Sequence, residues 1–178
     1  MRGVKPVFAL ALLLPLLAVA PALSQSGSSI KNHNANAPVD VASERIEVQD
    51  RANRAIFSGN VEVRQGELQL STSRLTVAYA NADGIEIQRL EASGGVILRS
   101  PSETARSQYA IYDLNRRLVT MIGGVTLNRG QSHVQGGRLV LDLDSGRAVM
   151  DGGTPGAPGT RETGGRVTGR FSVPQRGN

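Results

Sequence analysis

The stretch that decides the fold is RAIFSGNVEVRQGELQLSTSRLTV, Arg54 to Val77. Its apolar residues stand on alternate positions, a Gly-Asn pair interrupts them, and the alternation then resumes. A period of two is typical of strands that bury one face and expose the other. The glycine of the pair, Gly59, indicates a bulge or bend, because it has no Cβ and adopts positive φ without strain. The stretch therefore predicts a bent strand followed by a second strand.

The first part of this stretch recurs along the chain. RAIFSGNVEV (54–63), RLEASGGVIL (89–98) and LVTMIGGVTL (118–127) superimpose without a gap, and RAVMDGG (147–153) matches the opening of a fourth copy. A further strand-like segment follows each of the first three copies. Repeats at this spacing are typical of stacked supersecondary units.

The repeated glycines predict the fold class. Gly59, Gly94 and Gly123 occupy the same place in the three copies and are separated by 35 and 29 residues. We expect each of these strand-bend glycines to bend its strand at the same level, so that the sheet folds over on itself around an apolar interior. The chain is therefore predicted to be all-β, a jelly roll or a related sandwich built from short antiparallel strands.

The start of the chain has the features of an export signal. Arg2 and Lys5 precede the short apolar run at 7–20, and small residues follow that run. Residues 1–24 are therefore predicted to be a cleaved signal peptide. An uncleaved membrane anchor is the alternative, but the run is shorter than the roughly 20 apolar residues that span a bilayer.

The rest of the chain divides into three parts. Residues 25–38 form a polar leader, residues 39–151 form the β domain, and residues 152–178 form a tail rich in Gly, Pro and Arg. The tail includes RVTGRFSV (166–173), which is a candidate for a last edge strand.

Alternation within the repeats predicts which side chains face the interior and could contact a lipid. Polar residues such as Glu62 and Thr76 stand between them and are predicted to face outward, whereas Tyr109 is placed inside. The candidate interior residues are Phe57, Val61, Val63, Leu68, Leu70, Leu75, Val77, Leu90, Val96, Leu98, Ile111, Met121, Val125, Leu127, Leu139 and Leu141.

This interior has two interpretations at the level of sequence. The chain holds only three Phe and three Tyr and no Trp, so its core is made mainly of Val, Leu, Ile and Ala. Such side chains form either a dry core, which any sandwich shows, or the lining of a slot for a ligand. The alternation is the same in both cases.

Catalytic and metal-binding patterns are missing from the sequence. The two histidines are His33, in the leader, and His133, in the turn-rich segment RGQSHVQGG, where we expect a solvated loop side chain. Asp142 and Asp144 could suggest calcium, but the Ser-Gly that follows favours a hairpin turn. Cysteine is absent, which excludes thiol catalysis and thiolate metal sites. No catalytic residue, metal or cofactor is predicted.

The charge distribution and the edges of the predicted sheet indicate which kinds of partner the chain can bind. Without residues 1–24 the chain has 18 basic and 15 acidic residues, and the basic ones are scattered singly, which argues against nucleic-acid binding. An open sheet leaves unpaired backbone groups at its edges. Ile46 and Val48 near the start, and Val149 near the end, are candidate edge-strand residues for pairing with another chain, with a capped edge as the alternative.

The opening of the β domain resembles a known family. RIEVQD (45–50), FSGNV (57–61) and VRQGELQL (63–70) resemble the first strands of the LptA/OstA-like family of periplasmic lipopolysaccharide-transport proteins. ASGGV (92–96) and IGGVTL (122–127) resemble its later Gly-Asn-Val elements, with glycine in place of the asparagine.

The resemblance implies a partly open β-jelly roll in the periplasm whose interior holds the acyl chains of lipopolysaccharide. Protomers of the family stack head to tail as a homo-oligomer through their terminal strands. They connect the tether of the inner-membrane export complex with the outer-membrane translocon, and they catalyse no reaction.

Three rival functions remain at this stage. They are a structural or adhesive β-repeat protein with a dry core, another component of the same export pathway that shares the fold, and a hydrolase that uses His133.

Overall fold

The computed structural model describes residues 33–81, 84–153 and 165–172. These residues form ten strands and one short 3-10 turn, with no α-helix among them. The predicted all-β fold is confirmed. The strands are β1 (Asp40–Ala42), β2 (Arg45–Gln49), β3 (Arg54–Gln65), β4 (Leu68–Ala80), β5 (Glu86–Arg99), β6 (Glu103–Asp113), β7 (Leu118–Arg129), β8 (Ser132–Asp142), β9 (Arg147–Asp151) and β10 (Thr168–Arg170), and the turn is η2 (Asp50–Ala52).

Some predictions concern residues outside these ranges. The predicted signal peptide at 1–24, the first part of the leader and most of the tail lie outside the described residues. Within the predicted edge segment 166–173, the structure places the short strand β10.

All strands belong to one antiparallel sheet. The long strands β3 to β8 pair in chain order. At one edge β1 and β2 both pair with β3, as two halves of a strand interrupted at residues 43–44. At the other edge β9 and β10 both pair with β8. The sheet therefore has eight strand positions, and its two edges are not joined to each other among the described residues.

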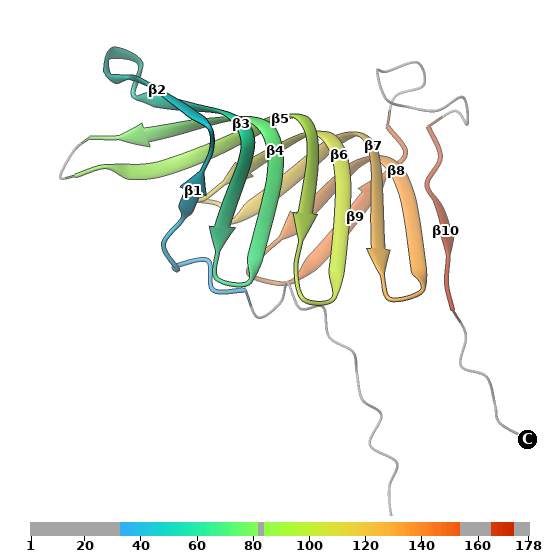
Figure 1. The fold of residues 1–178 in the computed structure, drawn as a ribbon. Coiled ribbons are helices and arrows are strands. Elements are labelled where there is room, and N and C mark those ends of the chain that lie inside the picture. The colour runs from blue at the N-terminus through green and yellow to red at the C-terminus, as the bar shows by residue number, and fades with distance from the viewer. Residues whose placement is uncertain (1–32, 82–83, 154–164, 173–178) are drawn as a thin grey trace, which may run out of the picture.

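Each long strand bends near its middle, and the bends divide the sheet into two facing walls (Figure 1). The first wall contains β1, β10 and the halves of the long strands next to the turns at 66–67, 100–102 and 130–131. The second wall contains β2, β9 and the other halves. The register shifts between β3 and β4, β5 and β6, and β7 and β8 lie at Gly59, Gly94 and Gly123.

These glycines are required by backbone conformation and by close packing. Their φ angles are +78°, +86° and +91°, which non-glycine residues rarely adopt. A Cβ on Gly123 would stand 2.9 Å from the Cβ of Gln108. A Cβ on Gly94 would overlap the side chain of Ser73 in β4, and one on Gly59 would overlap that of Glu44, which lies between β1 and β2. The bends therefore lie side by side across the sheet.

The space between the walls is filled by apolar side chains from both walls. Leu75, Met121 and Leu139 are fully buried, and Val96 and Leu141 are almost as inaccessible. They belong to one contiguous cluster that runs from β3 to the β8–β9 turn. This cluster holds the two walls together through apolar burial, in a chain without disulfides.

One part of the predicted interior was wrong. Tyr109 and Ile111 are 56% and 38% exposed, whereas Ala110 and Tyr112 point inside with 2% and 5% exposure. In β6 the bend at Gln108 shifts the alternation by one residue. Before the bend the odd-numbered residues up to Ser107 point inward, and after it the even-numbered residues do. Ile111 therefore lies on the outer face of the second wall and does not contact the interior.

Candidate functional site

The interior between the walls is the candidate functional site. Of the predicted interior residues, Phe57 and Leu127 are partly buried and pack against the core, and Ile111 lies outside. The other thirteen are buried in one cluster: Val61, Val63, Leu68, Leu70, Leu75, Val77, Leu90, Val96, Leu98, Met121, Val125, Leu139 and Leu141.

This interior is tightly packed around Leu68 and Leu98. One cavity of about 20 Å³ and one of about 10 Å³ lie between the walls, and both are bordered by Leu68 and Leu98. A volume of roughly 10–15 Å³, measured in this way, is the least that holds one water molecule. Around these two leucines the side chains of the protein itself therefore fill the interior, and an acyl chain would need the walls to move apart there.

At the edge formed by β2, the apolar interior face of the second wall is exposed to solvent. Ile46 and Val48 on β2 pair across from Phe57 and Ala55, and directly opposed residues of a pair lie on the same face. Both therefore belong to the interior face of the second wall, yet they are 55% and 56% exposed. The interior thus ends at this edge in an uncovered apolar surface.

The opposite edge is better covered. Met150 on β9 pairs across from Leu139 and packs against the core. Val149 pairs with Val140 and faces outward, so of the three predicted edge residues it alone points away from the interior side. Beyond it, Phe171 follows β10 and is 70% exposed.

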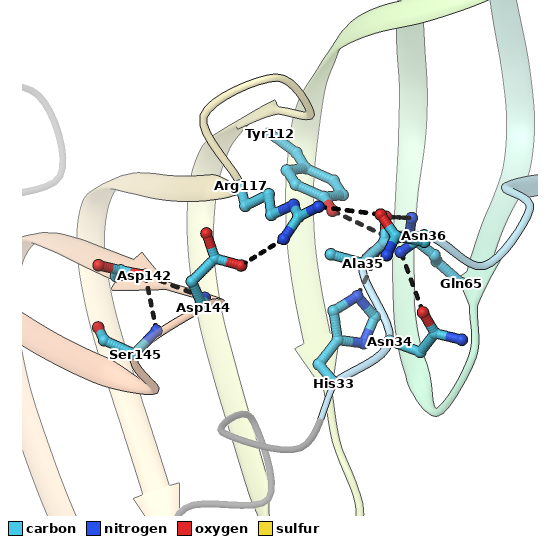
Figure 2. A network of polar contacts seen from close by, with 10 residues as sticks. All are labelled: His33, Asn34, Ala35, Asn36, Gln65, Tyr112, Arg117, Asp142, Asp144 and Ser145. Atoms are coloured by element: carbon cyan, nitrogen blue, oxygen red, sulfur yellow. Dashed lines mark hydrogen bonds and ion pairs between the residues drawn. The ribbon is translucent and has the colours of Figure 1, made fainter.

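A buried polar pair borders the larger cavity. Gln65, at the end of β3 in the first wall, is 4% exposed, and Tyr112, in β6 of the second wall, is 5% exposed. The Tyr112 hydroxyl donates a hydrogen bond of 2.8 Å to Gln65 Oε1 (Figure 2). Burial is the largest cause that raises the pKa of the Tyr112 phenol, which keeps it protonated and able to donate. This bond joins the two walls directly.

The end of the leader joins the same network. Gln65 Nε2 donates to the carbonyl oxygens of Ala35 and Ala37 at 2.9 and 3.0 Å, and Gln65 Oε1 lies 3.1 Å from His33 Nε2. Arg117, in the β6–β7 turn of the second wall, donates to Asn36 Oδ1 at 2.9 Å.

Little in the sequence indicates this network. Gln65 stands two residues after Val63 and four after Val61, at a position where the alternation predicts an inward side chain. A polar residue at such a position is the one feature of the sequence that indicates a buried hydrogen bond. The leader residues have no period of two, and their backbone carbonyls are what Gln65 recognises. Side-chain patterns cannot predict a contact of that kind.

The histidines and aspartates serve local structure. His33 contacts Gln65, and His133 lies on β8 rather than in a loop, with its ring nitrogens 2.6 Å from Asn128 Oδ1 and 2.7 Å from Gln135 Nε2. The expectation of a solvated loop histidine at 133 was therefore wrong.

The two aspartates belong to the β8–β9 turn. Asp142 accepts the backbone N–H groups of Asp144 and Ser145, both at 3.0 Å, and Asp144 pairs with Arg117 at 2.7 Å. Within the described residues no cluster of three or more metal-ligating side chains occurs. The same part of the chain has no helix long and apolar enough to cross a membrane.

Comparison with protein families identifies this architecture. Residues 40–147 match the model of the family described as LptA/(LptD N-terminal domain) LPS transport protein. The chain belongs to this family. The match covers β1 to the start of β9, which is nearly the whole folded unit.

Two individual proteins are similar to this LptA-family chain. An uncharacterized protein of Rhizobium meliloti (strain 1021) is 30% identical over 142 residues, which are 76% of this chain and 75% of the relative. The crystal structure of LptH from Pseudomonas aeruginosa, described as the LptA homologous periplasmic component of the lipopolysaccharide transport device, superimposes with a TM-score of 0.68. It is 15% identical, and the match covers 78% of this chain and 98% of LptH, so this likeness supports the fold.

Proposed function

We propose that this chain is exported to the periplasm, where it holds the acyl chains of lipopolysaccharide between its two walls and helps carry the lipid from the inner to the outer membrane. The observation that carries this proposal is the apolar interior, which runs across the sheet and ends in the exposed Ile46 and Val48. Each buried CH₂ is worth about 0.8 kcal/mol. A lipid with several acyl chains therefore needs such a shelter in water.

A packed interior can still carry lipid if acyl chains take the place of side-chain contacts between the walls. Acyl chains inserted between the walls would replace contacts between Leu, Val and Met side chains with similar apolar contacts. Transfer of the chains from this interior to another apolar interior then changes the free energy little, which suits a carrier that must also release its lipid. The exposed edge face would let the chains pass to a second copy, to the inner-membrane tether or to the outer-membrane translocon.

The test is site-specific photo-crosslinking in cells that make lipopolysaccharide. A diazirine amino acid at Leu98, which borders both cavities, is expected to capture lipopolysaccharide, and the same group at Phe57 should do so near the edge. Arg99, the exposed neighbour of Leu98, is the matched control and should capture none. Equal labelling at Leu98 and Arg99, or none at Leu98, would overturn the proposal and favour a structural β-repeat protein with a dry core.

A hydrolase is disfavoured by the contacts of His133. Both of its ring nitrogens face side-chain amides, and no carboxylate hydrogen-bonds to the ring among the residues that the structure describes. His133→Ala is therefore expected to leave lipopolysaccharide capture at Leu98 unchanged.

A further inference from the structure

The end of the leader forms a short strap across one rim of the interior. The strap comprises residues 33–37, and its own turns hold its shape through the bonds from Ala35 N to His33 O and from Ala37 N to Asn34 O. Figure 2 shows it lying beside Gln65, with Tyr112 and Arg117 directed toward it. The strap therefore contacts the first wall through Gln65 and the second wall through Arg117.

The strap completes the hydrogen bonding of a buried group. A glutamine amide offers two N–H donors and an oxygen with two lone pairs. Gln65 uses both donors on the strap carbonyls of Ala35 and Ala37, and its oxygen contacts Tyr112 and His33. Without the strap, the Nε2 group would face the rim of an apolar cavity with no partner. The strap is thus matched to the closed position of Gln65.

The same contacts hold the walls together beside the larger cavity. Gln65 and Tyr112 are the polar members of the cavity lining, and the rest are apolar side chains of both walls. A ligand that enters the interior at this rim must separate Gln65 from Tyr112. It must also displace the strap, because the strap is bonded to Gln65 on one side and to the second wall on the other.

The contact with the second wall is suited to reversible opening. Arg117 divides its guanidinium between Asn36 on the strap and Asp144 in the β8–β9 turn, and its side chain is 38% exposed. When the strap leaves, Arg117 keeps its ion pair with Asp144, and water replaces Asn36. Exchange of an exposed hydrogen bond for one to water changes the free energy little.

We propose that the strap is an autoinhibitory closure of the lipid-binding interior. Residues 33–37 keep the walls closed at the Gln65–Tyr112 rim while the protein is empty, and they leave when acyl chains enter there. This inference rests on the proposed function and adds to it the entry point and the segment that guards it.

The first test compares two neighbouring arginines. Arg117→Gln removes the contact with Asn36, whereas Arg116→Gln alters an exposed side chain of the same turn and is the matched control. Binding of fluorophore-labelled lipopolysaccharide to the purified mature chain is measured by stopped flow. We expect association about tenfold faster and affinity raised by a similar factor for a chain that starts at residue 39, because the binding-competent fraction rises. Arg117→Gln removes one exposed hydrogen bond of the strap and should change both quantities in the same direction by a smaller factor of about two. Arg116→Gln should behave as the wild type.

The second test follows the strap itself. Hydrogen exchange of the Ala35 and Ala37 amides is compared with and without saturating lipopolysaccharide, and we expect faster exchange in the complex. If the wild type binds, but Arg117→Gln and Arg116→Gln bind equally fast, or the strap amides stay protected in the complex, the strap is a static part of the fold and the inference is overturned. A wild-type chain that binds no lipopolysaccharide overturns the proposed function, and the strap's role with it.

Discussion

Individual glycines set the position of each bend. Gly123 has φ +91° and faces the side chain of Gln108. We predict that Gly123→Ala lowers the free energy of unfolding by about 2–4 kcal/mol, because backbone strain and steric overlap add. Gly66→Ala is the control, because Gly66 has φ +54° but a Cβ there would meet no other atom within 4 Å, which leaves only strain of about 1 kcal/mol. Urea denaturation measures both, and equal losses would contradict the packing role of the bend.

The two faces of the second wall differ sharply at the level of single residues. Met121 is fully buried, whereas Ile111 on the neighbouring strand is 38% exposed on the outer face. We predict that Met121→Ala lowers the free energy of unfolding by about 2–5 kcal/mol, and that Ile111→Ala lowers it by less than about 1 kcal/mol. Urea denaturation of both variants checks the orientation of β6. A loss for Ile111→Ala as large as that for Met121→Ala would place Ile111 in the interior.

The sequence alone predicted which residues point into the interior in those strands that have one apolar and one polar face. In β3 and β7 the positions of the interior residues follow the alternation through the glycine, because the bend there takes up two residues and keeps the phase. In β6 the run Tyr109-Ala110-Ile111-Tyr112 is apolar on both faces, and the bend at Gln108 has no glycine to mark it. Alternation cannot choose between two apolar faces, so the phase of β6 had to come from the structure.

At the scale of elements, the edge strand β2 leaves part of the interior face uncovered. Ile46 and Val48 lie on that face, and Glu47 between them points the other way. If copies of the chain associate through this edge, Val48→Asp should weaken concentration-dependent self-association, because a charge would be buried in the contact. Glu47→Gln is the matched control and should change it little. Sedimentation velocity over a range of concentrations is the measurement, and a wild type that stays monomeric throughout would refute assembly through β2.

The β8–β9 turn contributes acid-sensitive stability. Backbone N–H groups, first that of Ser145, hold the pKa of Asp142 below its usual value. Its contribution is therefore complete above the unfolded pKa of about 3.9 and is lost as the pH falls through the lower folded value. We predict that the melting temperature of Asp142→Asn falls less steeply than that of the wild type below pH 4. Parallel curves for the two proteins would show that this carboxylate does not contribute.

For the whole molecule, the proposed loading with lipid predicts a change of shape. The two cavities that Leu68 and Leu98 border are too small for an acyl chain, so lipid held between the walls would push them apart there. The chain has no cysteine, and therefore Glu91→Cys on the second wall and Arg106→Cys on the first wall would carry the only spin labels. Lipopolysaccharide is expected to lengthen the distance between these labels by several ångström in pulsed electron resonance.

A pair of labels within one wall controls for distortion of the sheet. Arg99 and Arg106 both lie on the first wall and are exposed. Labels at these two positions should keep their distance when lipid binds. An unchanged distance between walls in a complex that has captured lipid would place the lipid outside the interior.

The stacked bends also determine how the length of the molecule can vary. Neighbouring strands lie about 4.8 Å apart, so eight strand positions give an interior roughly 34 Å long. Every second strand supplies the glycine and its neighbour supplies the opposing side chain, as Gly94 and Ser73 do. A working unit is therefore two strands, and duplication or loss of a unit changes the span in steps of about 10 Å. Insertion of a single strand would reverse the direction of every strand after it, so the two edge strands of the sheet would run parallel instead of antiparallel to each other.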